Sequence, residues 1–97
     1  MEYVKFDWYT EKSRLNKAKH GVSFEEAKTV FQDENARLIA DDTHSIDEDR
    51  FVLLGLSFAL RLLVVCHCYR ESDHVIRIIS ARRASQTERL TYLRLLP

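Results

Sequence analysis

The stretch that decides the fold of this chain is His74–Glu88, HVIRIISARRASQTE. Its first part, Val75–Ala81, is rich in β-branched residues and alternates in polarity, which predicts a β-strand. Ser85 follows shortly afterwards, and Glu88 stands three residues beyond it, which is the spacing of a helix capping box. We therefore expect a strand that passes almost directly into a helix, with a double arginine between them.

The double arginine, Arg82-Arg83, indicates an anion site at this junction. A helix N-terminus offers free N–H groups and a partial positive charge, so two guanidinium groups beside it would weaken the helix unless an anion binds there. Phosphate is the commonest such anion. The alternative is that both are solvated arginines at the end of a strand. Because successive strand residues point to opposite sides, one member of the pair is expected to face the site.

The patterns on either side extend this strand and helix into an α+β fold. Apolar segments predict strands at Tyr3–Trp8, Arg37–Ala40, Arg50–Leu54, Leu62–Tyr69 and Val75–Ala81. Capping residues and apolar spacing predict helices at Thr10–His20, Phe24–Phe31 and Ser85–Leu95. The order βααββββα, with short strands joined by turns, favours an antiparallel β-sheet meander. Its two N-terminal helices and its C-terminal helix are expected to cover one face.

Apolar spacing assigns a different role to each helix. The first has only a thin apolar face, Leu15 and Ala18, and is expected to lie on the surface. The second, Phe24–Phe31, carries a core face. The last is expected to bury Leu90 and Leu93.

Strand alternation also predicts which strand residues share a face. Arg77, Ile79 and Ala81 fall on one side of the fifth strand, while His67 and Tyr69 fall together on the fourth. We expect one face of the sheet to be packed under the helices. The opposite face is expected to be partly open and to carry Arg77, His67 and Tyr69.

Length and composition are typical of a single domain over residues 1–97. The 97 residues, 45% of them hydrophobic, can bury one modest core. The net charge is zero, but residues 1–49 hold seven basic and twelve acidic side chains. Residues 50–97 hold eight basic side chains, all arginine, and three acidic ones. Because guanidinium groups suit phosphate recognition, an arginine-rich face is expected to bind phosphate.

The Cys66-His67-Cys68 segment predicts neither a metal site nor a disulfide. Adjacent strand residues alternate between faces, so these three cannot converge on one ion. The two cysteines would lie about 6.5–7 Å apart along a strand, near or beyond disulfide reach. With no signal peptide at the polar N-terminus, we expect a protein of the reducing cytoplasm without metal or cofactor.

One long apolar segment, Phe51–Cys68, raises the alternative of a membrane span. Arg61 at its centre, and Gly55 and Ser57 near a break, favour two buried strands instead. We therefore expect no contact with a membrane.

Catalytic candidates come from scattered side chains, because no nucleotide-binding glycine loop, serine-hydrolase elbow or HExxH motif is present. His20 ends the first helix, beside Lys19, and a helix C-terminus favours a histidine cation. It either caps free carbonyl groups or transfers protons. In the second helix, Ser23 and Glu26 have capping-box spacing, which occupies Glu26 and leaves Glu25 freer.

Several of these residues fall in segments that resemble the BrnT family of bacterial toxins. The segments are Phe6-Asp7-Trp8, Lys19–Ala27 (KHGVSFEEA), Arg50 with Leu54-Gly55, Arg77–Arg82 (RIISAR), Ala84 and Glu88-Arg89. The resemblance covers nearly the whole chain, from Phe6 to about Tyr92. It implies a RelE-like fold, endoribonuclease activity and a cytoplasmic toxin–antitoxin system. The implied partner is BrnA, an antitoxin that binds DNA through a ribbon–helix–helix domain and forms a hetero-oligomer with the toxin.

The reaction that the resemblance implies needs no metal. A base removes the proton of the ribose 2′-OH, which attacks the adjacent phosphorus, and arginines stabilise the charge that develops. The catalytic candidates are His20, Glu25, Arg77 and Arg82, with His20 or Glu25 transferring the proton. The candidates for RNA or phosphate binding are Lys19, Arg50, Arg83 and Trp8. Trp8 either stacks on a base or belongs to the core. Within the double arginine, the resemblance favours Arg82 as the residue that faces the site.

A second hypothesis assigns no catalysis to the chain. A toxin that has lost nuclease activity would act only as a binding module that modulates how its antitoxin binds DNA and represses the operon. The arginines and His20 favour the active enzyme.

Overall fold

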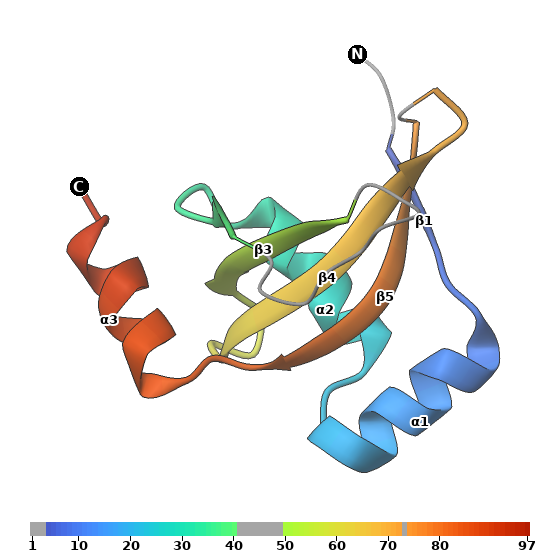
Figure 1. Ribbon diagram of the computed structural model, residues 1–97, viewed down its shortest axis with the longest axis horizontal. Coiled ribbons are helices and arrows are strands. Elements are labelled where there is room, and N and C mark those ends of the chain that lie inside the picture. Colours follow the sequence, from blue (N-terminus) through green and yellow to red (C-terminus); the bar gives the residue numbers. More distant parts are fainter. Residues whose placement is uncertain (1–3, 41–49, 73) are drawn as a thin grey trace.

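The computed structural model describes residues 4–40, 50–72 and 74–97 (Figure 1). The strands are β1 (Lys5–Asp7), β2 (Arg37–Ile39), β3 (Phe51–Leu56), β4 (Leu62–Arg70) and β5 (Val75–Arg83). The helices are α1 (Thr10–His20), α2 (Phe24–Thr29), the 3-10 turn η1 (Val30–Gln32) and α3 (Gln86–Arg94). The described strands form one sheet in the order β1-β5-β4-β3-β2. The predicted α+β class and element order are confirmed.

The sheet is mixed, so the prediction of a wholly antiparallel meander is wrong. Strands β2 to β5 form the meander, but β1 lies parallel to β5, with Lys5 opposite Val75 and Asp7 opposite Arg77. The sequence pattern of β1 shows only that it is a strand, and the free edge of β5 supplies its hydrogen-bonding partners. Of the predicted strand, Tyr3 lies outside the described residues.

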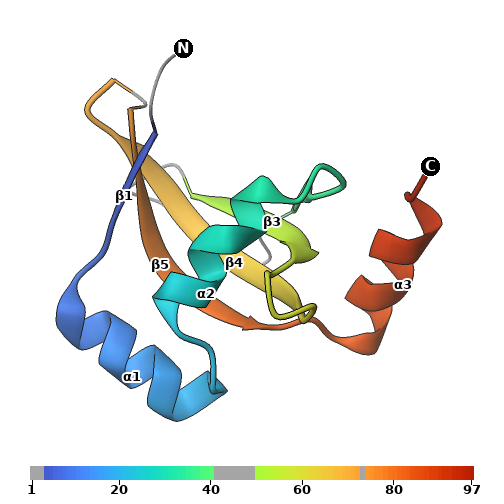
Figure 2. The ribbon, with the colours of Figure 1, turned by 180° about the vertical axis from the view of Figure 1, so that it is seen from behind.

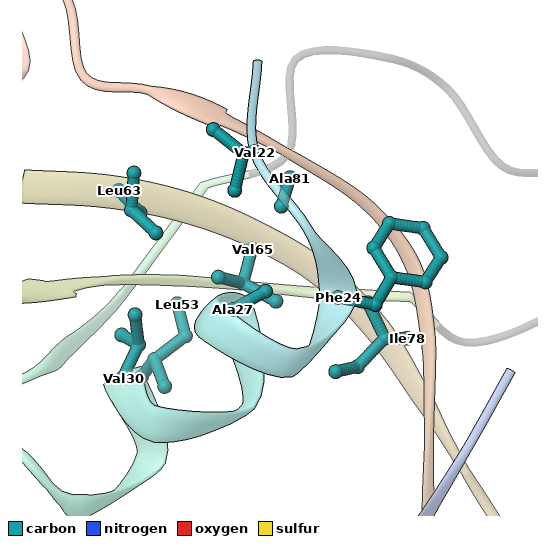
Figure 3. Packing of buried hydrophobic residues seen from close by; sticks show 9 residues of the cluster. All are labelled: Val22, Phe24, Ala27, Val30, Leu53, Leu63, Val65, Ile78 and Ala81. Carbon is teal, nitrogen blue, oxygen red and sulfur yellow. The ribbon is translucent and has the colours of Figure 1, made fainter. Parts of the chain in front are cut away.

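The helices lie on both faces of the sheet, not on one. Figure 2 shows α2 in front of the sheet, where it contributes to the main core. The residues of that core are Val22, Phe24, Ala27, Val30, Leu53, Leu63, Val65, Ile78 and Ala81 (Figure 3). Helix α3 packs on the other face, where Tyr92 joins Leu54 and Val64 in a second, smaller cluster. The core face predicted for Phe24–Phe31 is therefore confirmed.

A β-bulge between β4 and β5 overturns the predicted alternation. Cys66 pairs with Ser80 and His67 pairs with Ile78, so Ile79 is an extra residue on β5. Ile78 and Ala81 therefore both face the core that α2 covers. His67 lies on that same covered face, fully buried, so it does not share an open face with Arg77.

Helix α1 is held to the sheet by a polar side chain. Its Leu15 is 51% exposed, as its thin apolar face predicted, whereas Asn16 is buried. The Asn16 amide nitrogen donates to the carbonyls of Val22 (2.9 Å) and Ala81 (2.8 Å), and its oxygen accepts from the Ala81 N–H (3.1 Å). Asn16 of helix α1 thus satisfies backbone groups at the edge of β5, beyond Arg77, where the pairing with β1 ends. It stops at Gly21, which has φ 71°, the left-handed conformation that glycine favours.

Helix α3 begins where it was predicted to begin, but the side that packs on the sheet is not the predicted side with Leu90 and Leu93. The Ser85–Glu88 capping box is formed. Leu90 and Leu93, however, are 48% and 52% exposed, so the prediction that they are buried is wrong. Tyr92 takes their place, because its ring packs on the sheet while its hydroxyl donates to Asp33 (2.7 Å).

The capping box predicted at the start of α2 is only half formed. Ser23 accepts from the Glu26 N–H (3.0 Å), but the Glu26 carboxylate turns to the β3–β4 turn. There it accepts from the Ser57 hydroxyl (2.6 Å) and pairs with Arg61. These bonds tie α2 to the turn and hold the pKa of Glu26 below its usual value, although burial opposes the shift.

The apolar segment Phe51–Cys68 forms sheet strands, as predicted. Within it, Gly55 permits a close approach, since a Cβ at this position would lie 2.9 Å from side-chain atoms of Val30 and Ala36. None of the helices in the described part of the chain is long and apolar enough to span a membrane.

Candidate functional site

The face of the sheet opposite α1 and α2 carries most of the predicted arginines. Arg77, Ser80 and Arg82 pair with Cys68, Cys66 and Val64, which alternate along β4 and therefore share a face. Asp7 pairs with Arg77 and lies on this face too. We call this side of the sheet, with Asp7, Cys66, Cys68, Arg77, Ser80 and Arg82, the open face; Cys68 on it is buried, whereas the Arg77 and Arg82 side chains are partly exposed. Helix α3 packs on the neighbouring part of the same side, over Leu54 and Val64.

Arg77 is held at one end of the open face by Asp7, the last residue of β1, and by Tyr9, which precedes α1. Its Nε and Nη2 donate to the two carboxylate oxygens of Asp7, at 2.9 and 3.0 Å. Its Nη1 donates to the Tyr9 hydroxyl at 3.1 Å, and its guanidinium carbon lies 4.9 Å from the Tyr9 ring centroid. The hydrogen bonds from Arg77 hold the pKa of Asp7 below its usual value, although burial opposes the shift, and the charges of Arg77 and Arg70 lower it further.

Arg82 is held at the other end by the first turn of α3. Its Nη1 and Nη2 donate to the two carboxylate oxygens of Glu88, at 2.8 and 2.9 Å. Glu88 also accepts from the Ser85 N–H at 2.8 Å. Mainly because of the Arg82 bonds, the pKa of Glu88 falls to about 2. The anion that the sequence predicted beside Arg82 is therefore supplied, in this structure, by the chain's own Glu88.

The two arginines of the pair separate as alternation predicted. Arg83 pairs with Leu63, so it projects from the face that α2 covers, whereas Arg82 lies on the open face. Arg83 is exposed and makes no side-chain ion pair among the described residues. The Cα positions of Arg77 and Arg82 lie opposite β4 residues four apart, which corresponds to about 13 Å along the strand.

Lys19 and His20 lie at the end of α1, which runs along the edge of β5. Asn16 binds Ala81, the residue before Arg82, and His20 follows Asn16 by one helical turn on the same side of α1. The end of α1 is thereby tied to the segment of β5 that carries the double arginine. His20 is half-buried, whereas Lys19 is exposed.

The remaining predicted residues lie in three different environments. Glu25 is exposed in the first turn of α2, away from the open face. Trp8 packs edge-on against Phe24, with ring centroids 5.9 Å apart, beside the main core. Arg50 is exposed just before β3, at a position that alternation puts on the open-face side of the sheet.

Asp7, Tyr9 and Asn16 are site residues that sequence reasoning missed. Alternation over Phe6–Tyr9 could have separated Asp7 and Tyr9 from the inward-facing aromatic residues. The parallel pairing that brings them to Arg77 has no local sequence signal. The sequence did not indicate that Asn16 is buried either, because one polar residue in a helix of mostly charged residues looks the same whether it is buried or exposed.

Taken together, the fold and the site define a class of small α+β proteins with two arginine–carboxylate pairs on one face of a mixed sheet. A model of the family described as "Ribonuclease toxin, BrnT, of type II toxin-antitoxin system" matches residues 8–88, and the chain belongs to this family. A comparison with curated proteins gives no match.

A solved structure gives independent support. The chain is similar to the Brucella abortus ribonuclease toxin BrnT, known from a crystal structure at 1.1 Å resolution, with a TM-score of 0.65 and 25% identity. The match covers 86% of this chain and 99% of the Brucella chain. The predicted family and fold are confirmed, and a toxin of this family pairs with an antitoxin.

Proposed function

We propose that this protein is an endoribonuclease that cleaves single-stranded RNA with its own side chains and without a metal ion. The observation that carries the proposal is the open face, where Arg77 and Arg82 are held in fixed positions by Asp7 and Glu88. A bidentate ion pair with a carboxylate fixes the orientation of a guanidinium group. The remaining N–H groups of that guanidinium can then bind a phosphate without a large loss of side-chain entropy.

The proposed reaction is attack by the ribose 2′-oxygen on the adjacent phosphorus. The bond from phosphorus to the 5′-oxygen of the next nucleotide breaks, which leaves a 2′,3′-cyclic phosphate and a 5′-hydroxyl. Negative charge develops on the phosphate oxygens, and Arg82 and Arg77 stabilise it. One group accepts the 2′-OH proton and another protonates the leaving oxygen.

His20 is the proposed proton-transfer group. The two carboxylates nearest the arginines have lowered pKa values, about 2 for Glu88, so both are ionised at neutral pH and are weak bases. Histidine is the side chain that most often transfers protons in general acid–base catalysis, and the end of α1 is tied to the β5 segment that carries Arg82. Glu25 is the second candidate, and its exposure in α2 makes it less suited to the role.

The proposed partner is a BrnA-like antitoxin with a ribbon–helix–helix domain, through which the complex binds DNA. An acidic segment of the antitoxin would occupy the open face and compete with RNA for Arg77 and Arg82. Lys19, Arg50 and Arg83 would add positive charge around the RNA path.

The product ends test the reaction. Purified protein is incubated with a labelled single-stranded RNA in the presence of EDTA, and the fragments are analysed for their termini. We expect cleavage that leaves 2′,3′-cyclic phosphate and 5′-hydroxyl ends, because the 2′-oxygen is the nucleophile. Fragments with 5′-phosphate ends, or cleavage that requires an added divalent metal, would contradict the mechanism.

A second outcome would favour the binding module. Both guanidinium groups already have bidentate carboxylate partners, which is also what a purely structural role would need. If the protein fails to cleave RNA and its expression does not arrest a bacterial host, while the complex with the antitoxin still binds operator DNA, the nuclease proposal is wrong.

A further inference from the structure

The ring of Tyr9 is an exposed aromatic surface that contacts Arg77. Tyr9 is 56% exposed and lies between β1 and α1. It occupies the N-cap position of α1, where its side chain makes no capping hydrogen bond. The preceding residue, Trp8, supplies the apolar contact with the core.

The ring is nevertheless held in place. Its hydroxyl accepts from Arg77 Nη1 at 3.1 Å, and Arg77 is itself fixed by two bonds to Asp7. An exposed aromatic side chain normally loses rotamer freedom when it binds a ligand, and a ring that is already oriented loses less. Asp7, Tyr9 and Arg77 thus form a preorganised unit with an accessible ring.

The charges around this unit favour a nucleic acid over other ligands. Arg77 lies against the ring, with its guanidinium carbon 4.9 Å from the ring centroid, and pairs with Asp7. Single-stranded nucleic acid requires cationic groups for its backbone and aromatic rings for its bases, which is the combination found here.

We propose that Tyr9 binds an unpaired nucleobase by stacking, beside the arginines that hold the RNA backbone. The inference rests on the proposed function, since it places one base of the RNA substrate at a stated residue. It assigns to Tyr9 the stacking role that sequence reasoning offered to Trp8, whose ring packs on Phe24. Stacking on a tyrosine ring is tolerant of sequence, so this site would strengthen binding to any single-stranded RNA.

The test measures binding without cleavage. The probes are a fluorescent single-stranded 2′-O-methyl RNA, which lacks the nucleophilic hydroxyl, and an abasic oligonucleotide of the same length and charge. We expect Tyr9→Leu to weaken binding of the first probe by about 5- to 150-fold, which is the range for loss of one base–aromatic stack. Binding of the abasic probe should stay at the wild-type level, and Tyr9→Phe should keep most of the affinity for both.

The matched control is Phe58→Leu. Phe58 is 74% exposed in the turn between β3 and β4 and is not part of the open face, so its loss should leave binding unchanged. An equal loss on both probes would overturn the inference, because Tyr9 would then act through the backbone-binding arginine. Unchanged RNA binding by Tyr9→Leu would also overturn it. If Tyr9→Leu binds RNA normally but loses affinity for the antitoxin, the ring is a protein contact.

The same experiment separates the inference from the proposed function. If wild-type protein cleaves RNA and Tyr9→Leu binds the 2′-O-methyl probe normally, the stacking site is wrong and the nuclease stands. If wild-type protein neither binds the probe nor cleaves RNA, the proposed function and the stacking site are both wrong.

Discussion

At the scale of single residues, His67 shows where local pattern fails. Alternation placed it on an open face, but it is fully buried among the rings of Phe31, Phe51 and Tyr69. Its Nδ1 lies 3.2 Å from the Val65 carbonyl oxygen, and its Nε2 has no hydrogen-bond partner among the residues that the structure describes. Which face of a strand is covered depends on pairing with distant segments, and a bulge changes the alternation locally.

The buried imidazole of His67 should make the stability of the protein depend on pH. Burial lowers the pKa of His67 below its ordinary value of 6.5, although the contact with the Val65 carbonyl opposes the shift. Below pH 6.5 the unfolded chain takes up a proton that the folded protein does not, so stability is full above that pH and falls as the pH drops. We expect the free energy of unfolding to be about 1 kcal/mol lower at pH 5.5 than at pH 7.5.

Urea denaturation of wild type and His67→Phe at both pH values checks this expectation. The phenylalanine variant keeps an aromatic ring and cannot take up a proton, so its stability should change much less over the same interval. The carboxylates with lowered pKa values, such as Glu26, Asp33 and Glu88, lose their contributions at lower pH. Equal losses in the two proteins would show that His67 is not the responsible group.

At the scale of elements, the sequence predicted where helices begin and end better than what they touch. The stop of α1 at Gly21 and the Ser85–Glu88 capping box follow from local chemistry and are confirmed. The attachment of α1 through Asn16 and the outward turn of Leu90 and Leu93 were not predictable from the sequence. Those contacts depend on which surface the rest of the chain offers to each helix.

Asn16 should be the residue that holds α1 in place. Replacing it by alanine removes hydrogen bonds to Val22 and to both backbone groups of Ala81. Buried polar groups left without partners are costly, so we expect Asn16→Ala to lower the free energy of unfolding by about 3 kcal/mol. Leu15→Ala, on the half-exposed apolar side of the same helix, should change it by less than about 0.5 kcal/mol. Thermal or urea denaturation that gave the opposite order would contradict this account of α1.

At the scale of the whole molecule, the class and the order of elements could be predicted, but not the layers. Periodicity defines strands and helices one at a time, so it led to the order βααββββα. It does not determine the parallel pairing of β1 with β5, or that α3 packs on the face opposite α2. Both features shape the site, because they bring Asp7 to Arg77 and Glu88 to Arg82.

The sequence predicted the arginines of the candidate site but not their partners. Arg77 and Arg82 were both expected at a phosphate, and both lie on the open face. Their carboxylates were not expected, since Asp7 is 70 residues from Arg77 along the chain. The double arginine predicted a free anion site, but the structure shows Arg82 paired with Glu88. A phosphate would have to share the Arg82 guanidinium with this carboxylate.

We propose that Arg82 on the open face stabilises the transition state of RNA cleavage. The most direct test of this proposal is single-turnover cleavage of one RNA by wild type, Arg82→Gln and Arg94→Gln. Arg94 is an exposed arginine in the last turn of α3, so its variant removes the same charge outside the site. Because the Arg82–Glu88 pair is partly exposed, both variants should melt near the wild-type temperature. We expect Arg82→Gln to cleave about 100-fold or more slowly than wild type, whereas Arg94→Gln should cleave at close to the wild-type rate. Equal rates for the two folded variants would contradict the proposal.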